Sequence, residues 1–286
     1  MTQPDSIVLR KTDQGMSLID YLARERACSQ RQAKNLLDQR VVFVNNRRVW
    51  MAKHKLVAGD RITIVSSVST RPKEWRPEVL YEDADAWVIN KPAGMVSVGP
   101  DSVESRLQQL WSDQYVRVAH RLDRETTGCL CVARSAAGFD RMVEAFATQR
   151  VVKLYDVLVM GIPRQASGTI RHKLDRQTAI SHWHCMASHR SVSHLQVRIE
   201  TGRTHQIRRH LAAAGLPVLG DRHYLTVALA DERFQRVPRQ MLHATHFSIR
   251  PIAELDGRLS ATAPWPADFR DVMRRFGLKR SRRTGK

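Results

Sequence analysis

The residues best suited to chemistry lie in one short stretch, His120–Gly128. It sets the carboxylate of Asp123 among Arg121, Arg124 and the imidazole of His120. Nearby positive charge favours the ionised form of a carboxyl group, so we expect Asp123 to be anionic at neutral pH and able to act as a catalyst. Most neighbouring Asp and Arg residues, however, form surface ion pairs of little energetic weight. From this stretch alone, a surface ion-pair cluster is the better interpretation.

Further blocks of sequence reverse that interpretation. In chain order they surround the first stretch: Val79–Asp83 followed by Val88–Gly94, then His120–Gly128, then Lys153–Tyr155, then Gly202–Arg208 with Gly220-Asp221 downstream. Several blocks in a fixed order are far more specific than any single motif. Over roughly Val79 to Pro264 the chain resembles the RluA family of RNA pseudouridine synthases.

The resemblance implies an RNA-modifying isomerase and gives roles to individual residues. Asp123 becomes the catalytic carboxylate, Arg208 its charged partner, and Tyr155 the ring against the target base with its hydroxyl near the reacting groups. Arg121 becomes the side chain that fills the gap left when the uridine is turned out of the RNA. Without the resemblance, Tyr155 would be interpreted as an ordinary strand aromatic, because strands are rich in tyrosine.

Pseudouridine formation breaks the bond between uracil and ribose, turns the base while it stays bound, and rejoins it through carbon. Neither oxidation nor phosphate transfer occurs, so we expect no cofactor. Asp123 can attack a sugar carbon, remove a sugar proton or add to the base, and the sequence leaves these three routes open.

The composition favours a polyanionic partner. The 286 residues carry a formal net charge of +19 and a pI near 10.7, which suits phosphate contacts with counterion release. We expect RNA contacts from His120, Arg124 and Lys91, although Lys91 can equally be a solvated surface charge. Solubility is the alternative explanation of the charge, but arginine is clustered, and residues 270–286 hold eight Lys or Arg against one acid.

Residues 15–65 predict a small domain of their own. Ser17 and Ser29 can cap two short helices, and short β-rich runs with turn residues follow. Basic side chains extend along and beyond the second helix: Arg31, Lys34, Arg47 and Lys53. The pattern resembles the ribosomal S-four-like RNA-binding domain with its αL motif. A small helical cap with a solvated basic face is the alternative.

The rest of the chain divides by composition. Residues 66–77 have the polarity and proline of a linker, 78–269 form the catalytic domain, and 270–286 form a basic tail. Short runs of Val, Ile and Leu alternate with helical stretches, which indicates an α+β fold. The resemblance adds a mixed, mostly antiparallel sheet around a central RNA-binding cleft.

Cysteine and histidine give little reason to expect a metal site. Cys28, Cys129, Cys131 and Cys185 fit no zinc spacing and are expected to be reduced thiols. The histidines at positions 182, 184, 189 and 194 are better explained as surface or RNA-facing side chains than as ligands. The sequence lacks a signal-peptide pattern and an apolar run long enough to cross a bilayer, so we expect a cytoplasmic monomer without a membrane partner.

Two rival functions belong to other classes of protein. A non-catalytic RNA-binding factor for ribosome assembly would have no reason to keep Asp123, Tyr155 and Arg208 together. A glycoside hydrolase using Asp123 and Glu125 is disfavoured, since residues two apart need not face one cleft. The RNA can be ribosomal or transfer RNA. The S-four-like pattern favours large-subunit ribosomal RNA.

Overall fold

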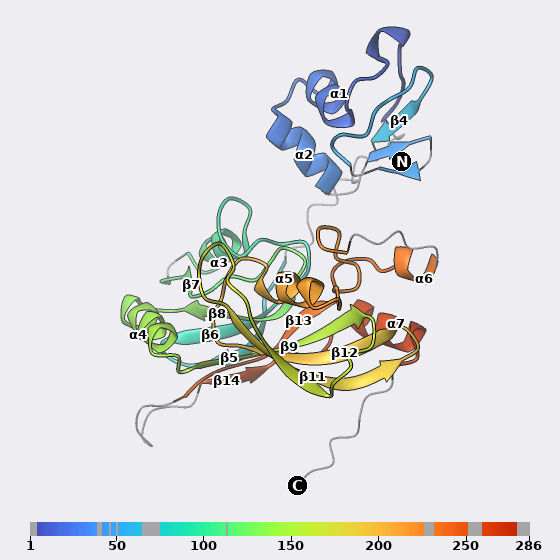
Figure 1. Cartoon of the computed structure of the whole chain (residues 1–286). Coiled ribbons are helices and arrows are strands. Elements are labelled where there is room, and N and C mark those ends of the chain that lie inside the picture. The colour runs from blue at the N-terminus through green and yellow to red at the C-terminus, as the bar shows by residue number, and fades with distance from the viewer. Residues whose placement is uncertain are drawn as a thin grey trace. The chain divides into compact units, whose positions relative to one another are not determined.

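The computed structural model describes residues 5–38, 42–45, 47–49, 51–64, 75–112, 114–225, 232–250 and 259–278. The chain divides into two compact units, an N-terminal unit of residues 1–76 and a C-terminal unit of residues 77–286 (Figure 1). Most of the expected linker, 66–74, and the end of the expected tail, 279–286, lie outside the described residues.

In the N-terminal unit, helices α1 (Leu18–Glu25) and α2 (Gln30–Asp38) begin as their caps predict. The Ser17 hydroxyl accepts the backbone N–H of Asp20 at 3.3 Å. Ser29 forms a reciprocal capping box, since its hydroxyl accepts the N–H of Gln32 at 3.3 Å while the Gln32 side chain accepts the N–H of Ser29 at 2.9 Å.

A four-stranded antiparallel sheet completes this unit, in the order β1 (Asp5–Val8), β4 (Arg61–Ile64), β2 (Val42–Val44) and β3 (Arg47–Arg48). The helices and strands enclose one apolar core that includes Leu22, Leu37 and Ile62. The expected domain start at residue 15 is wrong, because β1 pairs with β4 and Leu9 is buried in the same core. A 3-10 turn, Lys11–Asp13, joins β1 to the rest.

The C-terminal unit is built on one large sheet. Its strand order is β10 (Ser167–Arg171), β11 (Ile180–His189), β12 (Val192–Ile199), β9 (Val151–Met160), β13 (Leu242–Ile249), β8 (Thr127–Ala133), β6 (Ala86–Lys91) and β5 (Glu78–Glu82), with β14 (Ser260–Thr262) beside β13 and β7 (Arg117–Val118) beside β8. Of the described pairings only β13 with β8 is parallel. The expected α+β fold with a mixed, mostly antiparallel sheet is confirmed.

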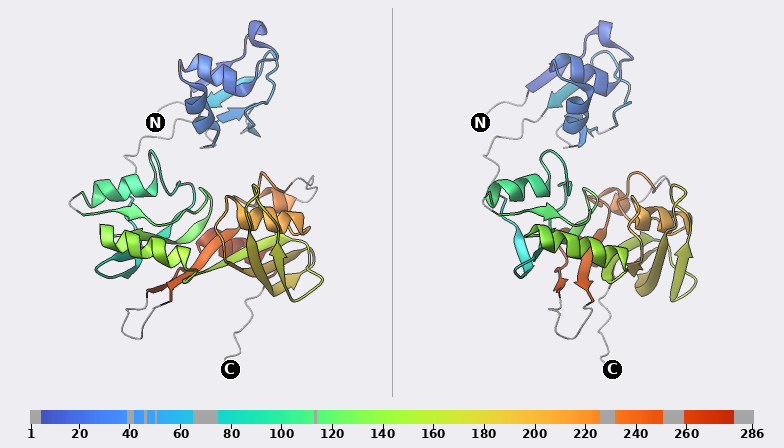
Figure 2. Two further views of the ribbon diagram at one scale, coloured as in Figure 1. Left: turned by 60° about the vertical axis from the view of Figure 1, so that its left-hand side comes forward. Right: turned by 90° about the vertical axis from the view of Figure 1, so that its left-hand side faces the viewer.

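Helices lie toward the two ends of this sheet (Figure 2). They are α3 (Val103–Leu110), α4 (Ala136–Ala147), α5 (Gln206–Ala213), the short α6 (Glu232–Gln235) and α7 (Ala267–Arg275). Met142 of α4 packs in a core with β6 and β8, whereas Phe269 of α7 packs in another with residues of β9 and β12.

The boundary expected between the catalytic domain and a basic tail at residue 270 is wrong. Helix α7 continues through Arg275, and Val272, Met273 and Phe276 are buried in the core beneath it. The arginines of α7 are exposed and alternate with these apolar positions, as in an amphipathic helix. The prediction of a tail was based on charge alone and did not consider this apolar face.

The parallel pairing of β8 with β13 depends on a glycine at the start of β8. Gly128 has φ +107°, and a Cβ there would stand 2.2 Å from the carbonyl oxygen of Ala244. Glycine alone allows both the conformation and the close approach of the two backbones. The loop that carries Asp123 leads directly into this strand.

Candidate active site

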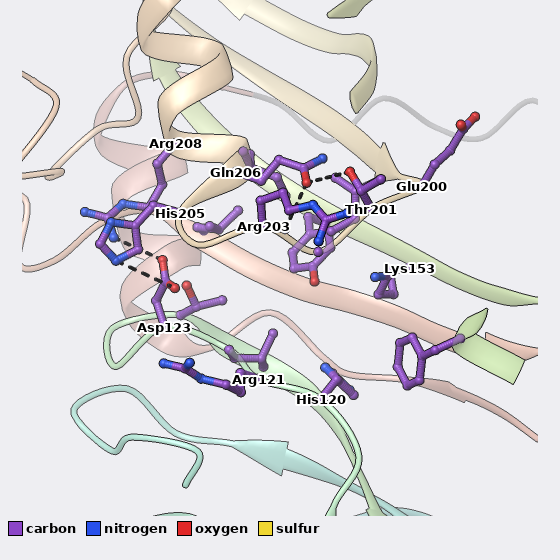
Figure 3. A pocket seen from close by; sticks show the side chains of 18 of the residues that line it. His120, Arg121, Asp123, Lys153, Glu200, Thr201, Arg203, His205, Gln206 and Arg208 are labelled. Atoms are coloured by element: carbon purple, nitrogen blue, oxygen red, sulfur yellow. Dashed lines mark hydrogen bonds and ion pairs between the residues drawn. The ribbon is translucent and has the colours of Figure 1, made fainter. Parts of the chain in front are cut away.

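A cavity of about 600 Å³ lies in the C-terminal unit (Figure 3). Its walls come from the loop before β8, from β9, and from the segment that joins β12 to α5. The volume falls in the range of pockets that hold a small-molecule-sized group. Asp123, Tyr155 and Arg208 all line it, so the structure brings together the three residues expected to be catalytic.

Hydrogen bonds from several elements fix the loop that carries Asp123. The Ser97 hydroxyl donates to the carbonyl of Leu122 at 3.0 Å and accepts its N–H at 2.9 Å. The N–H of Thr126 donates to the carbonyl of Asp123 at 3.0 Å. Arg239 Nη1 donates to the carbonyl of Glu125 at 3.0 Å. The carboxylate is therefore presented from an ordered backbone.

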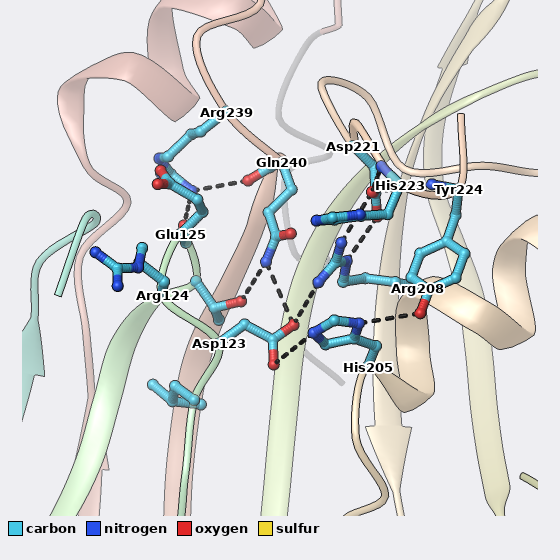
Figure 4. Close-up of polar contacts among 12 residues, drawn as sticks. Asp123, Arg124, Glu125, His205, Arg208, Asp221, His223, Tyr224, Arg239 and Gln240 are labelled. Carbon is cyan, nitrogen blue, oxygen red and sulfur yellow. Dashed lines mark hydrogen bonds and ion pairs between the residues drawn. The ribbon is translucent and has the colours of Figure 1, made fainter. Parts of the chain in front are cut away.

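The two oxygens of Asp123 have different surroundings (Figure 4). Oδ2 accepts a hydrogen bond from Arg208 Nη1 at 3.0 Å and a longer one from Gln240 Nε2 at 3.5 Å. The nearest ring nitrogen to Oδ1, Nε2 of His205, is 4.0 Å away, beyond hydrogen-bond distance. Among the described residues, the carboxylate is thus hydrogen-bonded through Oδ2, while Oδ1 has only the longer approach of His205.

Arg208 is held in turn by Asp221. Its Nε and Nη2 donate to the two carboxylate oxygens of Asp221 at 2.6 and 2.9 Å. The N–H groups of His223 and Tyr224 donate to the same carboxylate at 2.9 and 3.2 Å. The carboxylate of Asp221 is fully buried, and the guanidinium spans both carboxylates.

The same contacts shift the ionisation of both groups. Burial opposes ionisation of Asp221, but the hydrogen bonds and charge of Arg208 outweigh it and lower the pKa of the carboxyl. Burial likewise acts against the charged form of Arg208, yet Asp221 and Asp123 raise the pKa of the guanidinium. Both members of the pair remain charged at neutral pH.

His205 occupies a strained position at the start of α5. Its φ of 54° lies in the left-handed region, which is uncommon outside glycine and occurs at functional sites. Its Nδ1 lies 3.0 Å from the hydroxyl of Tyr224. Burial, and to a lesser degree the charge of Arg208, lowers the pKa of the imidazole despite the opposing charge of Asp123.

Strand β9 contributes Tyr155 and Lys153 to the cavity wall. Tyr155 is almost fully buried, and burial followed by the charge of Asp123 raises the pKa of its phenol. The phenol is therefore protonated at neutral pH and can donate a hydrogen bond. Burial lowers the pKa of Lys153 to about 8.

The residues expected to contact RNA beside Asp123 have different positions. Arg121 is exposed and lines the cavity. The exposed side chain of Arg124 points away from Asp123 (Figure 4). His120 lines the cavity, but its Nε2 accepts the N–H of Cys131 at 3.1 Å, and burial, with a smaller effect from Lys153, lowers its pKa to about 3. A neutral imidazole so engaged supports the loop and is no cation for a phosphate.

The expected RNA contact by Lys91 is wrong. Its side chain is completely buried, and Nζ donates to the carbonyls of Pro92, Met95 and Arg124 at 2.8, 2.7 and 3.1 Å. Lys91 therefore ties the turn after β6 to the loop that carries Asp123. Burial lowers its pKa to about 7.

Of the basic residues expected on the N-terminal unit, Lys34 and Lys53 are exposed. The side chains of Arg31 and Arg47 lie outside what the structure describes. Within the described ranges, no group of three or more His, Cys, Asp or Glu is placed to hold a metal ion. No described helix is long and apolar enough to span a membrane.

Several residues of the site received no role from the sequence: Asp221, Gln240, His205 and Lys153. Asp221 follows Gly220, which has φ +72° and where a Cβ would stand 2.0 Å from the carbonyl oxygen of Arg239. The pair Gly220-Asp221 marks a tight turn that delivers a carboxylate, and this was the available signal. Gln240 carried no such signal, because its contact depends on the sheet.

Comparisons with known proteins agree with this architecture. Residues 85–213 match the family model described as RNA pseudouridylate synthase. An uncharacterized RNA pseudouridine synthase of Zymomonas mobilis is 34% identical, covering 68% of this chain and 96% of that protein. The ribosomal large subunit pseudouridine synthase D of Escherichia coli O157:H7 is 30% identical, covering 83% of each.

Among solved structures, human RNA pseudouridylate synthase domain containing 4 has the same fold. The TM-score is 0.60 at 23% identity, covering 71% of this chain and 94% of that one. The chain therefore belongs to the RluA family of RNA pseudouridine synthases, which are isomerases.

Proposed function

We propose that this enzyme isomerises uridines of large-subunit ribosomal RNA and that Asp123 is the reacting carboxylate. The observation that carries the assignment is the asymmetry of Asp123 in the cavity wall: Oδ2 accepts a hydrogen bond from Arg208, whereas His205 Nε2 approaches Oδ1 only to 4.0 Å. Two relatives, from Escherichia coli and Buchnera aphidicola, are named ribosomal large subunit pseudouridine synthase D, which supports ribosomal over transfer RNA.

In this proposal the uridine is extruded from the RNA, at a cost of a few kcal/mol, and enters the cavity. The base stacks on Tyr155, a contact worth roughly 1–3 kcal/mol. Arg121, exposed at the cavity, takes the place that the base leaves in the RNA. Asp123 then acts at the sugar or at the base, and each of the three routes uses the same carboxylate.

The assignment is tested with Asp123→Asn, which keeps the size of the side chain and removes its charge. We expect loss of tritium release from RNA labelled at C5 of uridine, with RNA affinity close to that of the wild type, because binding depends on the many cations. Substantial tritium release by the variant would remove Asp123 from the catalytic role. Mapping pseudouridines in ribosomal and transfer RNA from cells with and without the protein identifies the substrate.

We also propose that the N-terminal unit is an S-four-like RNA-binding domain. Exposed Lys34 and Lys53, and the basic composition around Arg31 and Arg47, support it. A chain lacking residues 1–76 keeps the whole cavity, because every lining residue belongs to the C-terminal unit. It should convert uridine normally at saturating RNA but bind more weakly, with a shallower salt dependence. If the dependence of RNA affinity on salt is unchanged, the basic side chains of the N-terminal unit are solvated and do not contact RNA.

A further inference from the structure

Lys153 is a buried cation at the cavity without an anionic partner. Its side chain is 8% exposed, and its Nζ lies 5.4 Å from the centre of the Phe146 ring. Across the described ranges, the ammonium of Lys153 forms no hydrogen bond or ion pair, and burial alone accounts for its shifted pKa. A buried unpaired charge is costly, so such a group at a cavity suggests a ligand that completes it.

The neighbouring side chains do not neutralise this ammonium. Glu200 also lines the cavity, but its carboxylate is bound by His182 Nε2 at 2.7 Å and Arg198 Nη2 at 3.5 Å. Figure 3 shows this carboxylate directed away from Lys153. His120, on the other side, is neutral because it is buried and feels the charge of Lys153.

The position of Lys153 relates it to the base rather than to the sugar. It stands two residues before Tyr155 on β9, so both side chains leave the same face of the sheet, roughly 6.6 Å apart along the strand. Figure 3 places Lys153 across the cavity from Asp123. A base that lies on Tyr155, with its glycosidic bond at Asp123, extends its carbonyl edge toward the ammonium.

We propose that Lys153 is a further catalytic residue, whose ammonium stabilises the negative charge that develops on the uracil carbonyl oxygens when the base leaves the ribose. This inference rests on the proposed function. The bond between C1′ and N1 breaks with its electron pair on N1, and the charge spreads over O2 and O4. C5 then supplies the pair for the new bond to C1′, the C5 proton leaves to solvent and N1 gains one. Lys153 donates a hydrogen bond and keeps its proton.

A phosphate is the less suitable partner for this group. Phosphates of RNA remain largely hydrated, and exposed cations at the cavity, Arg121 and Arg203, are placed to meet them. Lys153 is instead buried beside apolar Phe146 and Ile199, where a planar ring fits and where a fixed charge acts most strongly on a developing anion.

The experiment compares two leaving groups. Single-turnover rates at saturating enzyme are measured for RNA with uridine and for the same RNA with 5-fluorouridine at the target. The rate is followed as consumption of the starting nucleoside, by mass spectrometry after digestion, because fluorine takes the place of the C5 proton and cannot leave as a cation. Fluorine itself stabilises the uracil anion, so it should partly replace the lysine. We expect Lys153→Met to lose roughly 100-fold on uridine, the usual effect of removing one such donor, and less than roughly 10-fold on 5-fluorouridine.

Lys153→Gln, which keeps a polar side chain without charge, should show the same contrast. Lys173→Gln removes one charge at an exposed position outside the cavity and should leave both rates unchanged. The melting temperature of Lys153→Met should not fall, because the substitution removes an unpaired buried charge.

Equal losses of rate on both substrates would overturn the proposal. So would a weaker dependence of RNA affinity on salt concentration in the Lys153 variants, by about the amount of one phosphate contact, because Lys153 would then bind a phosphate. Unfolding of both Lys153 variants would also overturn it, since the ammonium would then serve the fold. Failure of the proposed function is distinct, because the wild type itself would then convert no uridine.

Discussion

Replacing Asp221 with Asn tests whether the paired hydrogen bonds between Arg208 and Asp221, here called the fork of Arg208, hold the site in place. The carboxylate is fully buried and accepts hydrogen bonds from Nε and Nη2 of Arg208 and from two backbone N–H groups. The amide of Asn removes the charge and turns an NH₂ toward one of these donors. Removing one partner of a buried ion pair costs roughly 3–5 kcal/mol.

The lower end of that range applies here, because Arg208 keeps Asp123 as a second partner at 3.0 Å. A loss of about 3 kcal/mol lowers the melting temperature of a unit this size by roughly 6–12 °C. A guanidinium freed from its fork no longer fixes Asp123, and misplacement by about 1 Å can slow catalysis roughly 100-fold. Calorimetry and single-turnover tritium release measure the two effects.

The difference in stability between the wild type and Asp221→Asn should depend on pH in the way expected for the Asp221 carboxylate. Folding lowers the pKa of Asp221 below its ordinary value of 3.8, so its stabilisation is complete above that pH and is lost as pH falls through the folded-state pKa. The difference in melting temperature between wild type and Asp221→Asn should be constant from about pH 8 to 5 and narrow only below about pH 3.8.

Asp268→Asn is the matched control for this prediction. It removes the partner of another forked arginine, Arg239, with contacts of 2.7 and 2.9 Å, but this carboxylate is 34% exposed. We expect a smaller loss of stability, since solvent screens the pair. An Asp221→Asn protein with wild-type melting temperature and turnover would refute the role given to the fork.

Other substitutions test the supports of the same site. Gly128→Ala should lower the free energy of unfolding by more than about 4 kcal/mol or prevent folding, because its Cβ meets the carbonyl of Ala244. Gly94→Ala is the control: Gly94 has φ +85° but open space around it, so the cost should be about 1–2 kcal/mol in the same denaturant titrations. Arg208→Lys keeps the charge but cannot bridge both carboxylates, so kcat should fall at least about tenfold with little change in KM for RNA, and equal kcat would contradict this. Ser97→Ala leaves both backbone groups of Leu122 without their side-chain partner and should cost about 1–3 kcal/mol; a variant as stable as the wild type would show that the hydroxyl does not hold the loop.

Local signals in the sequence predicted local structure well. Ser17 and Ser29 cap the helices that they were expected to cap. Motifs far apart in the chain were expected to meet, and Asp123, Tyr155 and Arg208 do line one cavity. The ordered motif blocks and their resemblance to one family allowed the meeting of these three residues to be predicted.

The errors arose where burial decides the role of a residue. Lys91 has the sequence surroundings of an exposed cation, but three carbonyls that enclose it come from the folded turn and from a loop 33 residues later. In the sequence of α7, the several arginines drew attention away from the apolar positions, which are buried in the structure. Gln240 reaches Asp123 across 117 residues, a contact that only the sheet creates. Tertiary packing of this kind leaves no mark on neighbouring sequence.

The place of β13 in the sheet has a consequence for the synthesis of the protein. This strand is formed by Leu242–Ile249, yet it lies between β8 and β9, which are made long before it. Until it emerges, β9 lacks its partner from Val151 to Val157 and β8 lacks it at Thr127 and Gly128, and such unpaired edges invite pairing with other chains. Contacts this distant in sequence also form slowly. A growing chain therefore stays inactive, and open to aggregation, until nearly all of the catalytic unit has been made.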